Sequence, residues 1–153
     1  MATEYKKIMV TLDGSTFASQ ALPHAEKLAR LYGAELILFQ AASDAETVSQ
    51  MLGARGSVFH VDKRQIDSVD EATETLKEMA NKLNLQKIKT TPVVVVGRPA
   101  ESIIDYAQEN GVDLIVMTTH GRSGLARWVY GSVADKVLKG ARRSVFLVRT
   151  ELD

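Results

Sequence analysis

The amino-acid sequence predicts an α/β fold: an open sheet of five parallel strands with helices on both faces. Two observations lead to this prediction. Short apolar runs alternate along the chain with stretches whose apolar residues recur at helical spacing, and this alternation is typical of parallel strands joined by right-handed crossovers. Four consecutive valines at 93–96 further indicate a strand buried on both faces, as in a parallel sheet that helices cover on each side.

The overall composition is that of a single globular domain spanning residues 1–153. A formal net charge of zero argues against binding to nucleic acid or to an anionic membrane, because no global field attracts either. No apolar run approaches the roughly 20 residues of a membrane span, and the N-terminus does not resemble a signal peptide. The absence of cysteine excludes disulfides, thiol catalysis and thiolate-bound metal, and it fits a cytoplasmic protein.

The expected elements follow one another along the chain. Apolar runs predict strands at residues 6–12, 35–41, 89–96, 112–116 and 144–148. Helical spacing predicts a helix that ends at Gly33, a surface helix with apolar residues from Ala72 to Leu83, a helix that begins at Pro99, and a last helix at 132–140. Pro23 lies inside the first helical run, so it should either kink that helix or mark the start of its better-formed part.

Residues 42–69 are the least regular part of the sequence. We expect a partly ordered connection with a helical piece near residues 45–52, and connections of this length are commonly functional or mobile. The pattern Ser68-x-x-Glu71 matches a capping box, which predicts that the surface helix begins there.

The stretch 117–132, MTTHGRSGLARWVYGS, joins the fourth expected strand to the last helix. Its three glycines allow main-chain N–H groups to approach a ligand closely. The helix that follows has unpaired N–H donors and a partial positive charge at its N-terminus, which favours a phosphate-binding loop. The alternative is a long loop with glycines for turning, in which Ser132 caps the helix and Asp135 completes a capping box.

Asp13 follows the first expected strand, in the turn-forming sequence Asp-Gly-Ser. A carboxylate at that position can hold a ribose hydroxyl or reach a metal ion on a phosphate. The alternative is a local role, as a helix N-cap or in an Asx turn. The spacing of the residues by itself favours the local role.

Several motifs together resemble the universal stress protein family. Gly121, nine further residues and then Gly131-Ser132 resemble the second part of the family signature G-x2-G-x9-G-[S/T], whose first glycine is replaced by Thr118 in this chain. The segment from Gly97 to Ile103 resembles the family element G-x-P-A-x-x-I. Residues 7–15 resemble the first strand and turn of the family, and residues 112–117 resemble its fourth strand. The resemblance therefore covers nearly the whole chain.

The resemblance implies a Rossmann-like sheet with strand order 3-2-1-4-5 and a site for ATP, with Mg²⁺ or Mn²⁺ as a candidate companion. It implies that Asp13 lies at the ribose, that the main chain of Ala41 faces the base, and that the glycines of the signature and Ser132 hold the phosphates. The full set of nucleotide-binding candidates is Asp13, Ala41, Met117, Thr118, His120, Gly121, Arg122, Gly131, Ser132 and Val133.

The implied strand order makes the first and fourth strands neighbours at the point where the order reverses. Ligands of open parallel sheets bind at this point, outside the carboxyl ends of the strands. Asp13 and the stretch 117–132 follow those two strands, so they are expected to meet at one crevice although they lie far apart in the sequence.

Other recognisable sites are absent from the sequence. It has neither a Walker-type G-x4-G-K-[S/T] motif nor G-x-G-x-x-G after the first strand. The three histidines lack metal-ligand spacing, and no nucleophile elbow supports Ser132 and His120 as a nucleophile and its base. A phosphoacceptor receiver domain would need an acidic pair after the first strand and an acid at the end of the third, where Gly97 stands.

Two functions of different classes remain open. The first is a stress-response regulatory module that binds ATP and hydrolyses it slowly or not at all, because phosphoryl transfer normally needs metal and Arg or Lys clamps. The second is a dimeric interaction protein of the same fold that binds no nucleotide, which Thr118 favours because a side chain there could narrow the phosphate site. A homodimer is expected through residues 144–148, a short apolar strand at a sheet edge, and the resemblance implies the same pairing.

Overall fold

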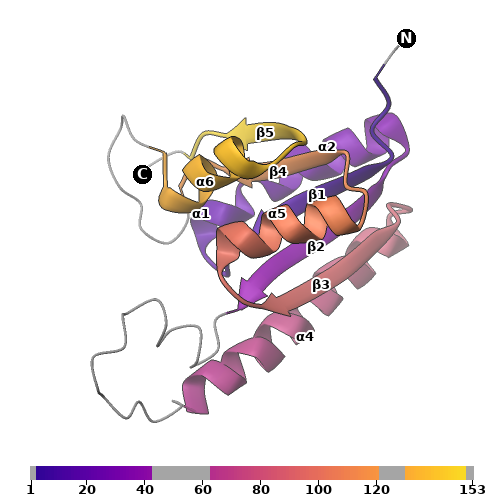
Figure 1. The fold of residues 1–153 in the computed structure, drawn as a ribbon. Coiled ribbons are helices and arrows are strands. Elements are labelled where there is room, and N and C mark those ends of the chain that lie inside the picture. Colours follow the sequence, from indigo (N-terminus) through magenta and orange to yellow (C-terminus); the bar gives the residue numbers. More distant parts are fainter. Residues whose placement is uncertain (1–2, 43–62, 121–129, 151–153) are drawn as a thin grey trace.

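Five parallel strands form one open sheet in the computed structural model, which describes residues 3–42, 63–120 and 130–150 (Figure 1). The strands are β1 (Lys7–Leu12), β2 (Glu35–Ala42), β3 (Thr90–Val96), β4 (Leu114–Thr118) and β5 (Ser144–Val148). Their order is β3-β2-β1-β4-β5, and every neighbouring pair is parallel. The expected fold class and strand order are confirmed.

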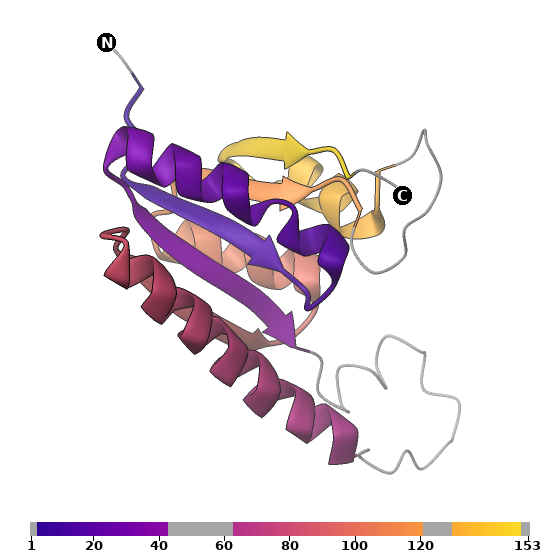
Figure 2. The same ribbon diagram turned by 180° about the vertical axis from the view of Figure 1, so that it is seen from behind.

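Helices cover both faces of this sheet, as the two opposite views show (Figures 1 and 2). The described helices are α1 (Thr16–Ser19), α2 (Leu22–Tyr32), α4 (Lys63–Leu85), α5 (Pro99–Glu109) and α6 (Ser132–Gly140). Helices α2 and α4 pack on one face, where they bury residues such as Ala25 and Leu76, and α5 and α6 pack on the other, where they bury Ile103 and Val137. No helix within these described ranges is both long and apolar enough to cross a membrane.

The central strands supply both hydrophobic cores because successive side chains of a strand point to opposite faces. In β1, Ile8 and Val10 belong to the core under α2 and α4, whereas Met9 belongs to the core under α5 and α6. In β2, Leu36 and Leu38 likewise belong to the first core, and Ile37 and Phe39 belong to the second. The apolar runs at residues 8–10 and 36–39 are therefore strand segments that are buried on both faces of the sheet.

Pro23 marks the start of a helix and does not kink one. The chain forms two helices here, because α1 ends at Ser19 and α2 begins at Leu22 with Pro23 in its first turn. Proline is tolerated there because the first N–H groups of a helix have no acceptor within it. Gly33 ends α2 in the left-handed conformation, with φ +60°, as a terminal glycine commonly does.

Helix α4 begins earlier than the capping box predicts. It starts at Lys63 and runs for 23 residues, so the Ser68-x-x-Glu71 pattern lies inside the helix and the expected start is wrong. The preceding segment Lys-Arg-Gln-Ile has good to moderate helix propensity and continues the helix backwards. The expected apolar face is confirmed, since Ala72, Leu76 and Leu83 are buried. The helical piece expected at residues 45–52 lies outside the described residues.

Strand β3 is an edge strand, which corrects the expectation that its valines are buried on both faces. Val93, Val94 and Val95 are only partly buried, and Val96 is 50% exposed. The run of valines fits a parallel sheet, but the strand order leaves β3 with a neighbour on one side only.

Candidate functional site

A cavity of about 270 Å³ lies at the carboxyl ends of β1, β2 and β4, beside the first turns of α5 and α6. This is the point at which the strand order reverses, where ligands of open parallel sheets bind. The residues that line the cavity are Thr11, Leu12, Asp13, Ala18, Phe39, Ala41, Pro99, Ile103, Met117, Thr118, Thr119, Gly131, Ser132, Val133 and Ala134.

Most of the candidates from the sequence come together in this cavity. Its lining includes these seven: Asp13, Ala41, Met117, Thr118, Gly131, Ser132 and Val133. His120 is not part of the lining, but its main chain contacts a lining residue, as described below. Gly121 and Arg122 lie outside the described residues.

Asp13 has the local role that was considered as an alternative, and it also lines the cavity. Its Oδ1 atom accepts hydrogen bonds from the main-chain N–H of Ser15, at 2.8 Å, and from the Ser15 hydroxyl. This is an Asx turn. The N-cap of α1 is Ser15, whose hydroxyl oxygen accepts from the N–H of Ala18 at 3.1 Å. The turn holds the half-buried Asp13 carboxylate at the cavity wall.

Thr118 and Thr119 organise the end of β4. The Thr118 hydroxyl donates to the carbonyl oxygen of His120 at 2.7 Å, and the Thr119 hydroxyl lies 3.1 Å from His120 Nδ1. The N–H of Thr119 donates to the carbonyl of Val148 in β5 at 3.0 Å. Both threonines are buried. The chain therefore leaves the sheet through a turn that its own hydroxyl groups stabilise.

Gly131 caps α6, and Ser132 is the first residue of that helix. The expected alternative, in which Ser132 caps the helix and Asp135 completes a capping box, is wrong: no side chain caps this end, and the Asp135 carboxylate instead accepts from Lys139 Nζ at 2.8 Å. The first N–H groups of a helix have no acceptor within it. Those of Ser132 and Val133, two lining residues, are thus available for an anion at the cavity.

Gly131 lies where two segments approach each other closely. Its N–H donates to the carbonyl of Thr119 at 2.8 Å. A Cβ atom built on Gly131 would lie 3.2 Å from that carbonyl oxygen and 3.6 Å from the Cα atom of His120. A side chain at this position would therefore make an unusually tight contact with the end of β4, which must shift slightly to accept it.

The wall of the cavity combines an apolar part with a few polar groups. Phe39, Ile103 and Met117 supply the apolar part. Of the four buried polar residues in the described part of the chain, three line the cavity: Thr11, Thr118 and Thr119. Apolar walls with a few polar groups are typical of small-molecule binding sites.

Sequence reasoning missed several of these wall residues. The sequence places Phe39 inside the strand expected at residues 35–41, and Pro99 and Ile103 in the helix expected to begin at Pro99. Pro99 and Ile103 lie in the G-x-P-A-x-x-I segment, which was itself the available signal. Behind the wall, the ring of Tyr106 packs on Phe39 with a centroid distance of 5.2 Å. Burial, and to a smaller extent the charge of Glu35, raises the pKa of the Tyr106 phenol.

A family model, curated relatives and solved structures all match this chain over nearly its whole length. A model of the universal stress protein family matches residues 4–149. The universal stress protein MJ0531 of Methanocaldococcus jannaschii is 34% identical over 145 residues, covering 95% of this chain and 82% of the relative. A solved structure of MJ0577, a universal stress protein of the same organism, matches with a TM-score of 0.73 at 28% identity, over 99% of this chain and all (100%) of the other.

Two more distant structures with the same fold are nucleotide complexes. One is a universal stress protein in complex with cAMP, with a TM-score of 0.65 at 23% identity over 97% of this chain and 100% of the other. The second, from Archaeoglobus fulgidus, is a complex with dAMP, with a TM-score of 0.62 at 23% identity over 95% and 98% of the two chains. The family match over residues 4–149, together with the 34% identical relative, shows that this chain belongs to the universal stress protein family.

Proposed function

We propose that this protein is an ATP-binding regulatory module of the stress response that hydrolyses ATP slowly or not at all. One observation carries the proposal. Asp13 and the first residues of α6, which are more than a hundred positions apart in the sequence, line one cavity at the reversal point of the sheet. The cAMP and dAMP complexes of structural neighbours support an adenine nucleotide as the ligand.

The chemistry of the wall suggests how the nucleotide would lie. The adenine ring would pack against the apolar wall of Phe39 and Met117, near the main chain of Ala41. The Asp13 carboxylate would accept from a ribose hydroxyl. The N–H groups of Ser132 and Val133 would bind phosphate oxygens at the N-terminus of α6, where the helix dipole favours negative charge. His120 would act through the turn that it shares with Thr118, and Gly121 and Arg122 are proposed to contribute from the same stretch.

Slow hydrolysis is proposed from the groups that line the first cavity. Phosphoryl transfer normally needs cations that neutralise the developing charge and a group that positions the attacking nucleophile. Among the described residues this lining has no Arg or Lys, and its only carboxylate, Asp13, is the proposed ribose ligand. If Mg²⁺ or Mn²⁺ accompanies the nucleotide, Asp13 and the phosphates would hold it. The proposed role is therefore binding and signalling, with slow hydrolysis or none.

The test is calorimetric titration of purified, nucleotide-stripped protein with ATP and Mg²⁺, beside Gly131→Ala and Gly131→Val. We expect micromolar binding by the wild type, weaker binding by the alanine variant and none by the valine variant, because added side-chain atoms displace the start of α6 from Thr119. Circular dichroism must show that all three proteins are folded. Absence of heat at millimolar ATP from the folded wild type would refute the nucleotide proposal.

The second candidate function is an interaction protein of the same fold that binds no nucleotide. The observation that favours it is the buried side chain of Thr118, which lines the cavity where the family signature has glycine. The same titration separates the two functions, since only the first predicts heat from the wild type.

We also propose that the protein is a homodimer that pairs through β5. The two sheet edges differ in this structure. At the β3 edge, the Asn84 side chain accepts from the N–H of Thr90 at 2.9 Å and donates to its carbonyl at 3.0 Å, and Pro92 has no N–H. Both features block strand addition. At the β5 edge, Phe146 is 39% exposed and the strand contains no proline, so we infer that a second copy adds there.

A further inference from the structure

A second cavity lies beside the first, between the first turns of α5 and α6. Its volume is about 330 Å³. Pro99, Ser132 and Val133 line both cavities, so the two adjoin along the start of α6. The second cavity adds three charged side chains to this shared wall: Arg98, Glu101 and Lys136. The two cavities thus differ in character, since the first has an apolar wall and the second has a charged one.

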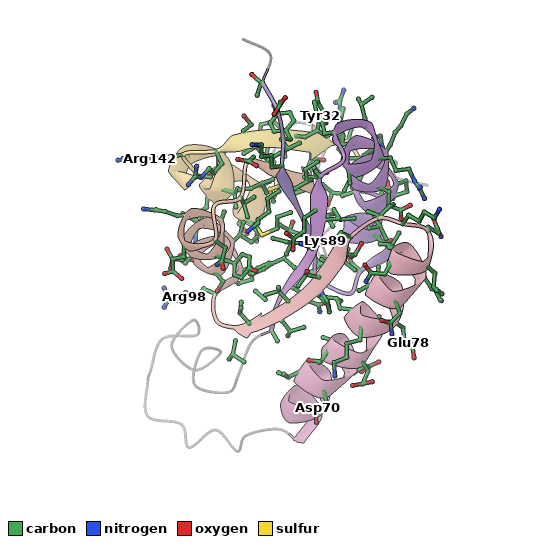
Figure 3. All side chains as sticks on the ribbon, turned by 90° about the vertical axis from the view of Figure 1, so that its right-hand side faces the viewer. Tyr32, Asp70, Glu78, Lys89, Arg98 and Arg142 are labelled. Carbon is green, nitrogen blue, oxygen red and sulfur yellow. The ribbon has the colours of Figure 1, made fainter. Side chains whose placement is uncertain are left out.

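The cations of the second cavity are weakly engaged by the protein. Lys136 Nζ lies 3.7 Å from Glu101 Oε1, and the two side chains are 61% and 49% exposed, so this ion pair contributes little to stability. Arg98 is exposed, at the end of β3 where α5 begins (Figure 3). Within the described part of the chain its guanidinium makes no hydrogen bond or ion pair. Two cations and one carboxylate leave this cavity with a net positive charge.

We propose that Arg98 and Lys136 form an anion subsite for the outer phosphates of a nucleotide polyphosphate whose nucleoside lies in the first cavity. This inference rests on the proposed function and extends it. A phosphate chain that passes the N–H groups of Ser132 and Val133 continues from the first cavity into the second, because those residues border both. A guanidinium binds phosphate through two parallel hydrogen bonds, and Lys136 adds a point charge. A monophosphate would end before it reaches either cation.

Glu101 has a defined part in this proposal. Its carboxylate holds Lys136 in the absence of ligand and must give up that cation to the phosphate. It also repels the phosphate itself. The subsite therefore binds polyphosphate less tightly than its two cations alone would, and removing the Glu101 charge should strengthen binding.

The experiment compares AMP with ATP on the full chain by calorimetry, without divalent metal so that only protein cations meet the phosphates. The variants are Arg98→Ala, Lys136→Ala, the double variant and Glu101→Gln. Lys139→Ala is the matched control, because Lys139 lies one turn further along the same helix, pairs with Asp135 and lines neither cavity. It removes the same charge as Lys136→Ala.

We expect each cation variant to weaken ATP about fivefold, in keeping with partly exposed charge pairs, and to change the affinity for AMP less than about twofold. The double variant should lose more ATP affinity than either single variant. Glu101→Gln should bind ATP more tightly than the wild type does, and Lys139→Ala should bind it with wild-type affinity. In wild type the ratio of ATP to AMP affinity should fall as salt rises, because salt screens exposed charges. That salt dependence should flatten in the double variant.

Several outcomes would overturn the subsite. Equal losses of AMP and ATP affinity would mean that Arg98 and Lys136 act on binding in the first cavity. Unchanged ATP affinity in the variants would mean that the phosphates do not reach these two side chains. An equally large loss of ATP affinity in Lys139→Ala would show that the effect comes from the overall charge of the protein and not from a subsite. Inorganic tripolyphosphate that bound as tightly as ATP, with the same losses in the variants, would make free polyphosphate the ligand. Wild-type protein that bound neither nucleotide would instead refute the proposed function itself.

Discussion

The Thr118 hydroxyl donates a hydrogen bond to the carbonyl oxygen of His120, 2.7 Å away. Thr118 is 6% exposed. Its hydroxyl is therefore engaged by the chain's own turn at the end of β4. The Thr118 side chain thus has a structural partner two residues further along the chain.

Replacing Thr118 with valine should lower the free energy of unfolding by about 1 kcal/mol, because the His120 carbonyl loses its donor while side-chain volume is kept. Thr118→Ser retains the hydroxyl and is the matched control, although it loses a buried methyl group. Urea unfolding at neutral pH measures both variants. A valine variant as stable as the wild type would show that the hydrogen bond contributes nothing to stability.

Thr118→Gly introduces the glycine that the resemblance implies at this position, and it tests whether threonine obstructs the phosphate site. Because the hydroxyl is hydrogen-bonded to the turn, we expect ATP affinities of variant and wild type within about threefold of each other, below about 0.7 kcal/mol. Calorimetry measures the affinities, and unfolding curves control for the flexibility that glycine adds. Binding by the glycine variant alone would make Thr118 the residue that closes the site in this protein.

Asp13→Asn separates the two roles of Asp13, since an amide oxygen can still accept from the N–H of Ser15 but carries no charge. We expect near-wild-type stability and about tenfold weaker ATP binding, because a charged acceptor of a ribose hydroxyl is lost. Asp13→Ala should lose both the turn and the binding. The ribose contact itself is tested with an ATP analogue that lacks ribose hydroxyls: this analogue should bind wild type and Asp13→Asn with similar affinity. If the wild type binds ATP and this analogue with equal affinity, Asp13 does not contact the ribose hydroxyls.

Val145→Pro should convert the proposed homodimer to a folded monomer. The N–H of Thr119 donates to the carbonyl of Val148, so even-numbered residues of β5 face β4 and the N–H of Val145 points to the open edge. Proline there removes a donor for a partner strand and keeps the bonds to β4, as Pro92 does in β3. Light scattering after gel filtration measures the mass. A wild type that is monomeric at micromolar concentration, or a variant that stays dimeric, would contradict pairing through β5.

Tyr106→Phe should reduce the loss of stability at alkaline pH. Burial raises the pKa of Tyr106 above its ordinary value of 10.0, so the folded state holds the proton more tightly than the unfolded state does. Stability therefore falls as the pH rises from about 10 through the raised value. Urea unfolding at several pH values between 8 and 11.5 should give a shallower decline for the variant. Parallel curves for the two proteins would show that Tyr106 does not titrate differently on folding.

Structural features that depend on residues close together in the sequence were predictable from it. The apolar runs identified all five strands, and Gly33 identified the end of α2, because hydrophobic periodicity and a left-handed glycine act over a few residues. The positions of Asp13 and Gly131 on the cavity also follow from the sequence once the strand order is known. That order was implied by the motifs of the family, and not by the periodicity of the chain.

Features that depend on distant neighbours were not predictable in the same way. The start of α4 at Lys63, five residues before Ser68, depends on the context of the folded chain, and a capping pattern can lie unused inside a helix. The edge position of β3 depends on the strand order, which cannot be predicted from its four valines. Phe39 and Ile103 were assigned correctly to a strand and a helix, yet their place in the cavity wall depends on how β2 and α5 pack.

The sequence by itself determined which segments are strands and helices, and which residues carry polar chemistry, because these depend on spacing along the chain. Only the tertiary structure decided that Gly131 and not Ser132 caps α6, that Thr118 binds the carbonyl of His120, and that Arg98 and Lys136 share a cavity. The physical reason is that caps, buried hydrogen bonds and cavities form between segments that meet only when the sheet is assembled.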